Sequence, residues 1–235
     1  MKYQAVIFDL FGTLLDFLTD DEYKAAHANV AEILGAPLDD FRQVWSSTIR
    51  DRDRGFFGSL EGDLANAARL LGLKPGADQL HRAAEVRLKL YAKNLTPRKG
   101  AIETLTALRA SGLKVGLITG CAWEVPALWP DTHFVPLMDF TVFSCVAGMS
   151  KPDPRIYELA CEGLGVRPED CLYVGDGGYY ELAGARQVGM DAVLIKVADD
   201  PYPYTSRQEA LEWQGPTISS LLQLLDLVNA VSLED

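Results

Sequence analysis

The sequence predicts an α/β fold, in which a mostly parallel β-sheet is covered by helices on both faces and an all-helical block follows the first strand. Three observations predict it. Short apolar runs alternate with segments of helical periodicity along most of the chain, which is the pattern of a parallel sheet. Several of these runs end at a polar residue. Residues 16–95 carry helical periodicity with little strand signal.

Five apolar runs are predicted to be strands. The first, Ala5 to Phe8, ends at Asp9, and Gly12 permits a tight turn shortly after it. The other four predicted strands are residues 114–120, 140–144, 171–176 and 192–195. Core helices are expected between or after these strands, at residues 101–110, 153–164 and 182–188.

The inserted block has its own helices and breaks. We expect helices at residues 23–34, 39–50, 62–71 and 77–93. The predicted organisation is a Rossmann-like core formed by residues 1–15 and 96–235, with a helical cap formed by residues 16–95. Residues 218–231 are Leu-rich at helical spacing, and we expect them to pack on the core or to contribute to a homodimer contact.

Composition narrows the class of protein and its partners. The chain has 235 residues, 48% of them hydrophobic, which is ample for a sizeable core. No apolar run approaches the roughly 20 residues that span a bilayer, so no membrane partner is expected. The first residues lack the shape of a signal peptide, and a cytoplasmic location is expected. The four cysteines form no Cys-x-x-Cys pair and are expected to be reduced, mostly buried thiols.

The net charge of the chain also limits the partners that we expect. A net charge of −11 repels phosphate backbones and argues against nucleic acid as a partner. It is compatible with a small anionic substrate, because a bound divalent cation reverses the local field. We therefore expect a small anionic molecule as the partner.

Four polar residues lie at the ends of predicted strands or shortly after them: Asp9, Thr119, Lys151 and Asp176. Each one alone is compatible with a capping or solvated side chain. In an open parallel sheet, however, residues at the carboxyl ends of the strands converge on one crevice. Their spacing through a single α/β pattern therefore indicates an active site.

The motifs around these residues closely resemble those of the haloacid dehalogenase superfamily. The matching segments are residues 8–14 (FDLFGTL), 117–120 (LITG), 151–157 (KPDPRIY), and Gly175-Asp176 followed by residues 184–186 (GAR). The resemblance covers the whole core, and the helical block lies where that superfamily carries a small cap. It implies a Rossmann-like sheet with strand order 3-2-1-4-5 and a mobile helical cap that closes over the site.

The resemblance also implies roles for the strand-end residues. Asp9 would attack the substrate and form a covalent aspartyl ester, which divides one hard displacement into two easier steps. Thr119 would donate a hydrogen bond to the transferring group, and Lys151 would hold the Asp9 carboxylate in its attacking orientation. A Mg²⁺ cofactor would be held by Asp9, Asp176 and the backbone carbonyl of Phe11, because hard oxygen ligands suit this ion.

Further residues are predicted to bind the substrate or to support the site. The backbone amide of Gly120, Arg42 in the cap and Tyr179 after the fourth strand are the candidates for substrate binding. A solvated helix face is the other interpretation of Arg42. Glu181 is expected to accept a hydrogen bond from Lys151 or to coordinate a metal-bound water. As an acid at a helix start, it is equally explained by the helix dipole.

Phe11 departs from the phosphatase pattern. Phosphatases of this superfamily carry an aspartate there, which protonates the leaving alcohol, and such help is worth roughly 100- to 10,000-fold. The favoured function is still a Mg²⁺-dependent hydrolase of a small phosphorylated metabolite, with an impaired or cap-supplied acid. A metal-independent 2-haloacid dehalogenase is the first alternative, because those enzymes carry an aromatic residue there and halide leaves without a proton. Their fourth motif resembles Ser-Ser-Asn, whereas this chain has Gly175-Asp176-Gly177.

Two further alternatives follow from the missing aspartate. A phosphonatase-like hydrolase also lacks it but keeps the metal, and would need a Schiff-base lysine in the cap, for which Lys24 is a candidate without a matching motif. The other alternative is a binding or regulatory protein that kept the fold and lost turnover through Phe11.

Overall fold

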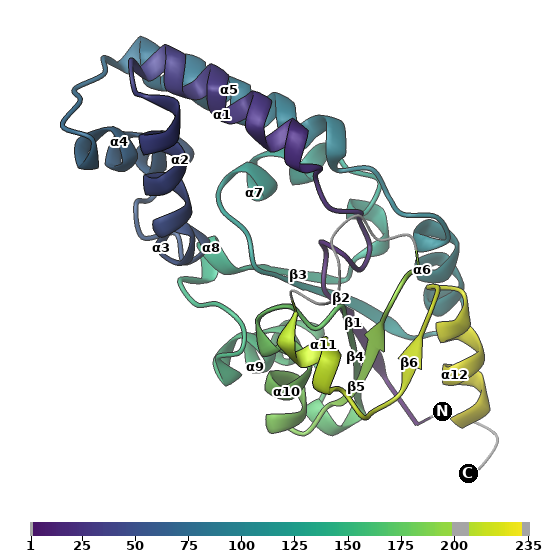
Figure 1. The fold of residues 1–235 in the computed structure, drawn as a ribbon. Helices are drawn as coiled ribbons and strands as arrows, with labels where there is room; N and C mark the ends of the chain where they lie inside the picture. The colour runs from purple at the N-terminus through teal and green to yellow at the C-terminus, as the bar shows by residue number, and fades with distance from the viewer. Residues whose placement is uncertain (1, 199–206, 232–235) are drawn as a thin grey trace.

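The computed structural model describes residues 2–198 and 207–231, which form one six-stranded sheet flanked by helices (Figure 1). All adjacent strands pair in parallel, in the order β3-β2-β1-β4-β5-β6. The strands are β1 (Ala5–Phe8), β2 (Lys114–Thr119), β3 (Phe140–Phe143), β4 (Cys171–Gly175), β5 (Asp191–Ile195) and β6 (Thr217–Ile218).

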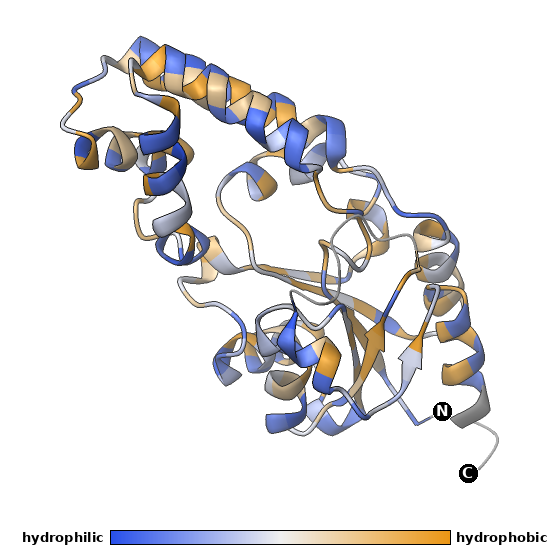
Figure 2. Cartoon of the chain, in the orientation of Figure 1, coloured by the Kyte–Doolittle hydropathy of each residue, from blue (hydrophilic) through white to orange (hydrophobic). Residues whose placement is uncertain are grey.

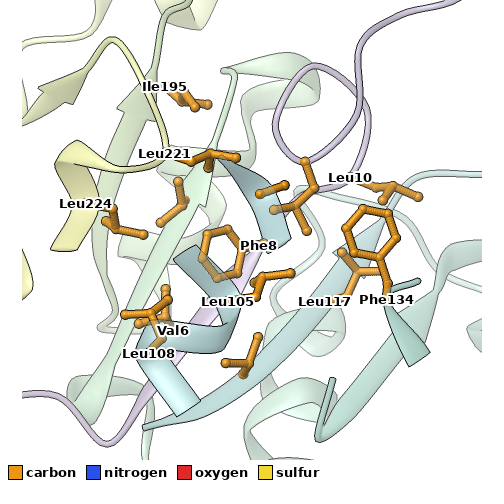
Figure 3. Close-up of a cluster of buried hydrophobic side chains, with 14 of the residues drawn as sticks. Val6, Phe8, Leu10, Leu105, Leu108, Leu117, Phe134, Ile195, Leu221 and Leu224 are labelled. Atoms are coloured by element: carbon orange, nitrogen blue, oxygen red, sulfur yellow. The ribbon is translucent and has the colours of Figure 1, made fainter. Parts of the chain in front are cut away.

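Helices cover both faces of the sheet. Those near the sheet are α6 (Ala101–Ala110), α7 (Glu124–Leu128), α8 (Ser144–Ala147), α9 (Pro154–Leu164), α10 (Glu181–Gln187), α11 (Gln208–Glu212) and α12 (Gln223–Val231). In β1, Val6 and Phe8 pack with side chains of α6 and α12 on one face (Figure 3). Ala5 and Ile7 face the opposite way and pack with α9 and α10. All four side chains are buried because side chains alternate along a strand and both faces are covered.

The chain between β1 and α6 is helical and has a hydrophobic cluster of its own. It contains α1 (Asp20–Leu34), α2 (Leu38–Ser47), α3 (Ile49–Asp53), α4 (Leu60–Leu70) and α5 (Ala77–Asn94). Thr19 and Glu22 form a capping box that starts α1. α1 lies along α5, and both show hydrophobic residues interleaved with polar ones, whereas the sheet is mostly hydrophobic (Figure 2). Phe41, Trp45 and Leu64 belong to the buried cluster of this helical block.

The structure confirms the predicted α/β fold and its strand order, and it adds β6 at the edge beside β5. Two helix predictions are wrong in detail. Ile218 belongs to β6, because Lys196 N–H donates to the Ile218 carbonyl at 2.8 Å, so the last helix begins only at Gln223. The helix predicted over residues 39–50 divides at Thr48, whose hydroxyl donates to the carbonyls of Val44 and Trp45.

The division into a core and a cap remains a prediction, and residues 199–206 and 232–235 of the predicted core lie outside the described residues. All four cysteines are free and buried, as expected. Within residues 2–198 and 207–231, no helix combines the length and the apolar character needed to cross a bilayer.

Candidate active site

Strand order places Asp9 in the middle of the carboxyl edge of the sheet. β1 lies between β2 and β4. Asp9 directly follows the last residue of β1, and its N–H donates to the carbonyl of Val174 in β4 at 2.9 Å. Asp9 therefore lies beside Asp176, which directly follows β4, and Thr119 ends β2 on the other side. The sheet thus brings the predicted strand-end residues to one edge.

Lys151 joins two buried carboxylates. Its ammonium lies 2.5 Å from Oδ1 of Asp9 and also donates to Oε2 of Glu181. The Tyr173 hydroxyl donates to the same Glu181 oxygen at 2.9 Å. This arrangement holds the Asp9 carboxylate in one orientation, in agreement with the position expected for Lys151. It also places Glu181 where a hydrogen bond from Lys151 was expected.

Burial and mutual repulsion perturb the acids of this cluster. Burial, followed by the charge of Glu181, raises the pKa of Asp9 to about 6 despite the opposing ammonium of Lys151. Burial also raises the pKa of Glu181 to about 7, and burial with the charge of Asp9 raises the pKa of Asp176 to about 6. For Lys151, burial lowers the pKa, but Asp9 and Glu181 outweigh it and raise the pKa overall. The cluster therefore contains more negative charge than its one lysine neutralises.

Asp176 has a second cationic neighbour that the sequence did not indicate. Nη1 of Arg207 lies 3.1 Å from Oδ2 of Asp176, and both side chains are buried. The other oxygen of Asp176 accepts a hydrogen bond from Gly178 N–H at 2.9 Å. Gly12 makes room for this carboxylate, because a Cβ there would lie 2.2 Å from Oδ2, and its φ of +80° also favours glycine.

A cavity of about 710 Å³ opens over these groups. Its lining includes Asp9, Phe11, Gly120, Lys151 and Asp176, so most of the predicted site residues face one space. The Thr119 hydroxyl is buried and, among the residues that the structure describes, has no hydrogen-bond partner. Its bond to a transferring group remains a prediction.

A second cavity of about 520 Å³ lies next to the first. Both are lined by Phe11, Phe17, Asp53, Gly120 and Tyr179, so the two spaces adjoin. Arg42 lines only the second cavity and is exposed, which separates it from Asp9. Its predicted contact with substrate therefore concerns a part of the molecule away from the reacting atoms.

The second cavity is also lined by two buried arginines, Arg52 and Arg87. Arg87 on α5 forms an ion pair with Glu124 at 2.8 Å, and both side chains are fully buried. Arg52 lies 3.8 Å over the Trp45 ring and donates to the Trp45 carbonyl at 2.8 Å. The ion pair of Arg87 with Glu124 joins segments far apart in the chain, so no local motif marks it.

Tyr179 has an unusual backbone conformation. It and Tyr180 have φ values of 56° and 55°, in the left-handed region that non-glycine residues rarely adopt. Both side chains are about half exposed, and burial of the hydroxyl raises the pKa of Tyr179. Such strain commonly accompanies functional loops, so the position of Tyr179 agrees with substrate binding, which is still a prediction.

The donor set at the sheet edge fits a hard divalent cation. Carboxylate oxygens of Asp9, Asp176 and Glu181 lie within 4.8 Å of one another. Glu181 is already engaged by Lys151, Tyr173 and Gly177 N–H, so Asp9 and Asp176 are the carboxylates better placed to hold an ion. Oxygen donors of this kind suit Mg²⁺. The role of the Phe11 carbonyl as a third ligand stays a prediction.

The fold and this site define an α/β protein with a buried cluster of acids at the carboxyl edge of its parallel sheet, where an aspartate follows a central strand. The sequence profile of the haloacid dehalogenase-like hydrolases matches residues 3–189. The chain belongs to this family.

Relatives within the family have different named activities. The chain is 30% identical over 201 residues to Phosphatase MT3486 of Mycobacterium tuberculosis (strain CDC 1551 / Oshkosh), covering 83% of this chain and 88% of that protein. It is 27% identical over 232 residues to (S)-2-haloacid dehalogenase 4A of Burkholderia cepacia, covering 94% of each. A crystal structure of a HAD phosphatase from Thermococcus onnurineus matches with a TM-score of 0.63 and 26% identity, covering 96% of this chain and 97% of that one.

Proposed function

We propose that the protein hydrolyses small phosphate monoesters, with Asp9 as the nucleophile and Mg²⁺ as the metal. The observation that carries this proposal is the cluster of three buried carboxylates formed by Asp9, Asp176 and Glu181. Without a divalent cation, this cluster would repel an anionic substrate. The family supports hydrolase chemistry, and the relative named a phosphatase supports the phosphoryl substrate.

The proposed reaction has two displacements at Asp9. The Asp9 carboxylate attacks phosphorus, a bond forms between them, and the bond to the leaving alcohol breaks. The leaving group departs as an alkoxide and takes a proton from solvent, because Phe11 has none to give. Water then attacks the phosphoryl group and loses a proton to solvent, the P–O bond to Asp9 breaks, and inorganic phosphate and the Asp9 carboxylate are released. Lys151 orients Asp9 through the contact of 2.5 Å and favours its ionised form. Mg²⁺ held by Asp9, Asp176 and the Phe11 carbonyl would screen the repulsion between the nucleophile and the phosphate.

Phe11 limits the range of substrates in this proposal. Phe11 lines the same cavity as Asp9, and its ring meets the Tyr91 ring edge-on, with centroids 6.2 Å apart. It has no proton to give to a leaving alkoxide, so esters whose alcohols are acidic should react fastest.

The first experiment compares two substrates with and without metal. Release of p-nitrophenol from p-nitrophenyl phosphate is measured with Mg²⁺ and with EDTA, beside chloride release from 2-chloropropionate. Phosphatase activity that Mg²⁺ restores after EDTA treatment is the expected result. Chloride release that EDTA leaves unchanged, with no phosphatase activity, would contradict the proposal.

A 2-haloacid dehalogenase is the second candidate, and Phe11 is the observation that favours it. An aromatic residue two positions after the nucleophile suits a leaving halide, which needs no proton, and relatives named (S)-2-haloacid dehalogenases match 94% of this chain. Against it stand Asp176 and Glu181, which add negative charge beside Asp9 where a haloacid carboxylate would have to bind.

The remaining alternatives are distinguished by covalent trapping. A phosphonatase-like reaction would need an amine for a Schiff base, and Lys24 lines only the second cavity, 3.5 Å from the carboxylate of Asp21. Borohydride reduction with a carbonyl substrate should therefore leave no adduct on Lys24. A binding protein without turnover would retain inorganic phosphate and Mg²⁺ yet form no phosphoryl adduct on Asp9, whereas the proposal expects such an adduct during turnover.

A further inference from the structure

Each carboxylate oxygen of Asp176 already has a partner. Oδ1 accepts a hydrogen bond from Gly178 N–H at 2.9 Å, and Oδ2 lies 3.1 Å from the guanidinium of Arg207. The side chains of Asp176 and Arg207 are only 4% and 7% exposed. A cation that binds between Asp9 and Asp176 would therefore approach an Asp176 oxygen that already contacts Gly178 N–H or the charged guanidinium of Arg207.

The segment that carries Arg207 is fixed against the site on two sides. Glu209, two residues later, accepts hydrogen bonds from the N–H groups of Leu182 and Ala183 at 3.0 and 2.6 Å. These amides belong to the first turn of α10, which has no intrahelical partners for them. Ala210 packs against Gly177, where a Cβ would lie 3.0 Å from the Ala210 nitrogen. Tertiary contacts of α11 thus place Arg207 at the carboxylate.

The charges show why this placement matters. Three carboxylates, those of Asp9, Asp176 and Glu181, are paired directly with two cationic side chains, Lys151 and Arg207. The cluster therefore carries a single negative charge when all five groups are ionised. Adding a divalent cation while Arg207 stays in contact with Asp176 would make the cluster positive, and the two cations would repel each other across one carboxylate.

We propose that Arg207 is an internal counter-ion that competes with Mg²⁺ for Asp176 and that it turns to the anionic substrate when the metal binds. Arg207 lines the same cavity as Asp9, so a guanidinium displaced from Asp176 stays where the substrate binds. Metal and anion then bind cooperatively, because the anion gives Arg207 a new negative partner in place of Asp176, which the metal has taken. This inference rests on the metal site of the proposed function.

Titration calorimetry of Mg²⁺ into the full chain tests the competition. Arg207→Gln removes the competitor and should tighten Mg²⁺ binding by about tenfold or more relative to the unsubstituted protein. Arg54→Gln is the matched control, because Arg54 lines the same cavity but donates to Ser150 Oγ at 3.2 Å. Loss of that exposed charge should tighten binding by less than about threefold. Equal tightening by both variants would reduce the effect to general electrostatics and overturn the proposal.

Inorganic phosphate tests whether Arg207 turns to the anion when the metal binds. Saturating phosphate should tighten Mg²⁺ binding in the unsubstituted protein by a larger factor than in Arg207→Gln. An equal factor in both would show that Arg207 does not turn to the anion. If thermal unfolding shows that Arg207→Gln is not folded, Arg207→Lys replaces it; this variant keeps the charge with a shorter reach and should show a smaller change of the same sign.

The two proposals fail in different ways. Absence of Mg²⁺ binding in every variant would contradict the metal site and the proposed function with it. Mg²⁺ binding with the same affinity in the unsubstituted protein and in Arg207→Gln would contradict only the competition.

Discussion

Two regions of the molecule bury charged side chains, and they do so differently. At the carboxyl edge of the sheet, Asp9, Glu181 and Asp176 each contact a buried lysine or arginine. In the helical block, Asp63 is buried on α4, and neither of its oxygens has a hydrogen-bond partner among the described residues. Burial raises the pKa of Asp63 to about 7.

The difference shows where a buried charge stabilises the fold and where it destabilises it. A buried ion that keeps its partner is tolerated, and removing that partner leaves an uncompensated charge. A buried acid without a partner already destabilises the fold whenever it is ionised. The sheet edge is thus organised around charge pairs, whereas α4 carries an acid that the folded protein holds more easily when it is protonated. Four predictions concern these two regions: two test the chemistry at the sheet edge, and two test how each region tolerates its buried charge.

The largest expected effect concerns the nucleophile. Asp9→Asn keeps the size of the side chain but removes the attacking carboxylate, so phosphatase turnover should fall by at least about 10,000-fold. The rate of p-nitrophenyl phosphate hydrolysis with Mg²⁺ measures it. Asp40→Asn, at an exposed position on α2, should retain the unsubstituted rate. Residual turnover of more than a few per cent in Asp9→Asn would assign the attack to another group.

Removing the shared cation should destabilise the sheet edge. Lys151→Met leaves Asp9 and Glu181 buried without their common partner, so the free energy of unfolding should fall by about 3–5 kcal/mol. Urea unfolding near neutral pH measures it. The double variant Lys151→Met/Glu181→Gln should recover part of the loss, since one unpaired acid is then neutral. No recovery would show that the loss comes from packing.

The third prediction concerns Phe11, which lines both cavities. Phe11→Asp supplies the missing proton donor, so kcat for phosphate esters with poor leaving groups should rise by about 100-fold, and that for activated aryl esters by much less. Steady-state rates over a series of esters with alcohols of different acidity measure the contrast. Equal changes across the series would show that proton donation is not what limits the reaction.

The smallest effect is expected in the helical block. Because the folded pKa of Asp63 lies above that of an unfolded aspartate, the folded state binds more protons between the two values, and stability falls as pH rises toward about 7. Asp63→Asn removes this penalty and should raise the free energy of unfolding by about 1–3 kcal/mol near pH 8, with a smaller gain near pH 5.

Urea unfolding at both pH values measures the Asp63 effect. Glu61→Gln, on the same helix, is the control and should change little, because Glu61 is exposed. A gain for Asp63→Asn that is equal at both pH values would contradict the assignment to ionisation.

Much of the site could be predicted because its residues follow strands directly. A buried apolar run that ends in Asp9 or Asp176 fixes where each acid emerges, and parallel pairing then brings these ends together. The contact of Lys151 with Asp9 was expected from the resemblance of residues 151–157 to the family motif, and its contact with Glu181 was one of the roles left open for that acid. The position of Arg42 could not be predicted in this way, because Arg42 follows no strand, and it lines the second cavity and not the one that contains Asp9.

Arg207, Glu209 and the pair of Arg87 with Glu124 had no signal in the sequence. Each depends on contacts between segments that lie far apart along the chain, such as Arg207 with Asp176. The short strand β6 was missed for the same reason, since its two residues have strand geometry only because β5 offers an unpaired edge. From the sequence alone, an isolated arginine or glutamate is expected to be a solvated side chain, because these residues are mostly exposed in folded proteins.

The sequence by itself determined the positions of the first five strands and of the longer helices along the chain, the acids that follow β1 and β4, and the absence of an acid at position 11. These features are local, because hydrophobic periodicity and the residue after each strand suffice to specify them. Tertiary structure alone decided which cations neutralise those acids, because a buried charge is paired by whatever group packing places within a few ångströms of it. Packing placed Arg207 beside Asp176, and it left Asp63 without a hydrogen-bond partner among the described residues.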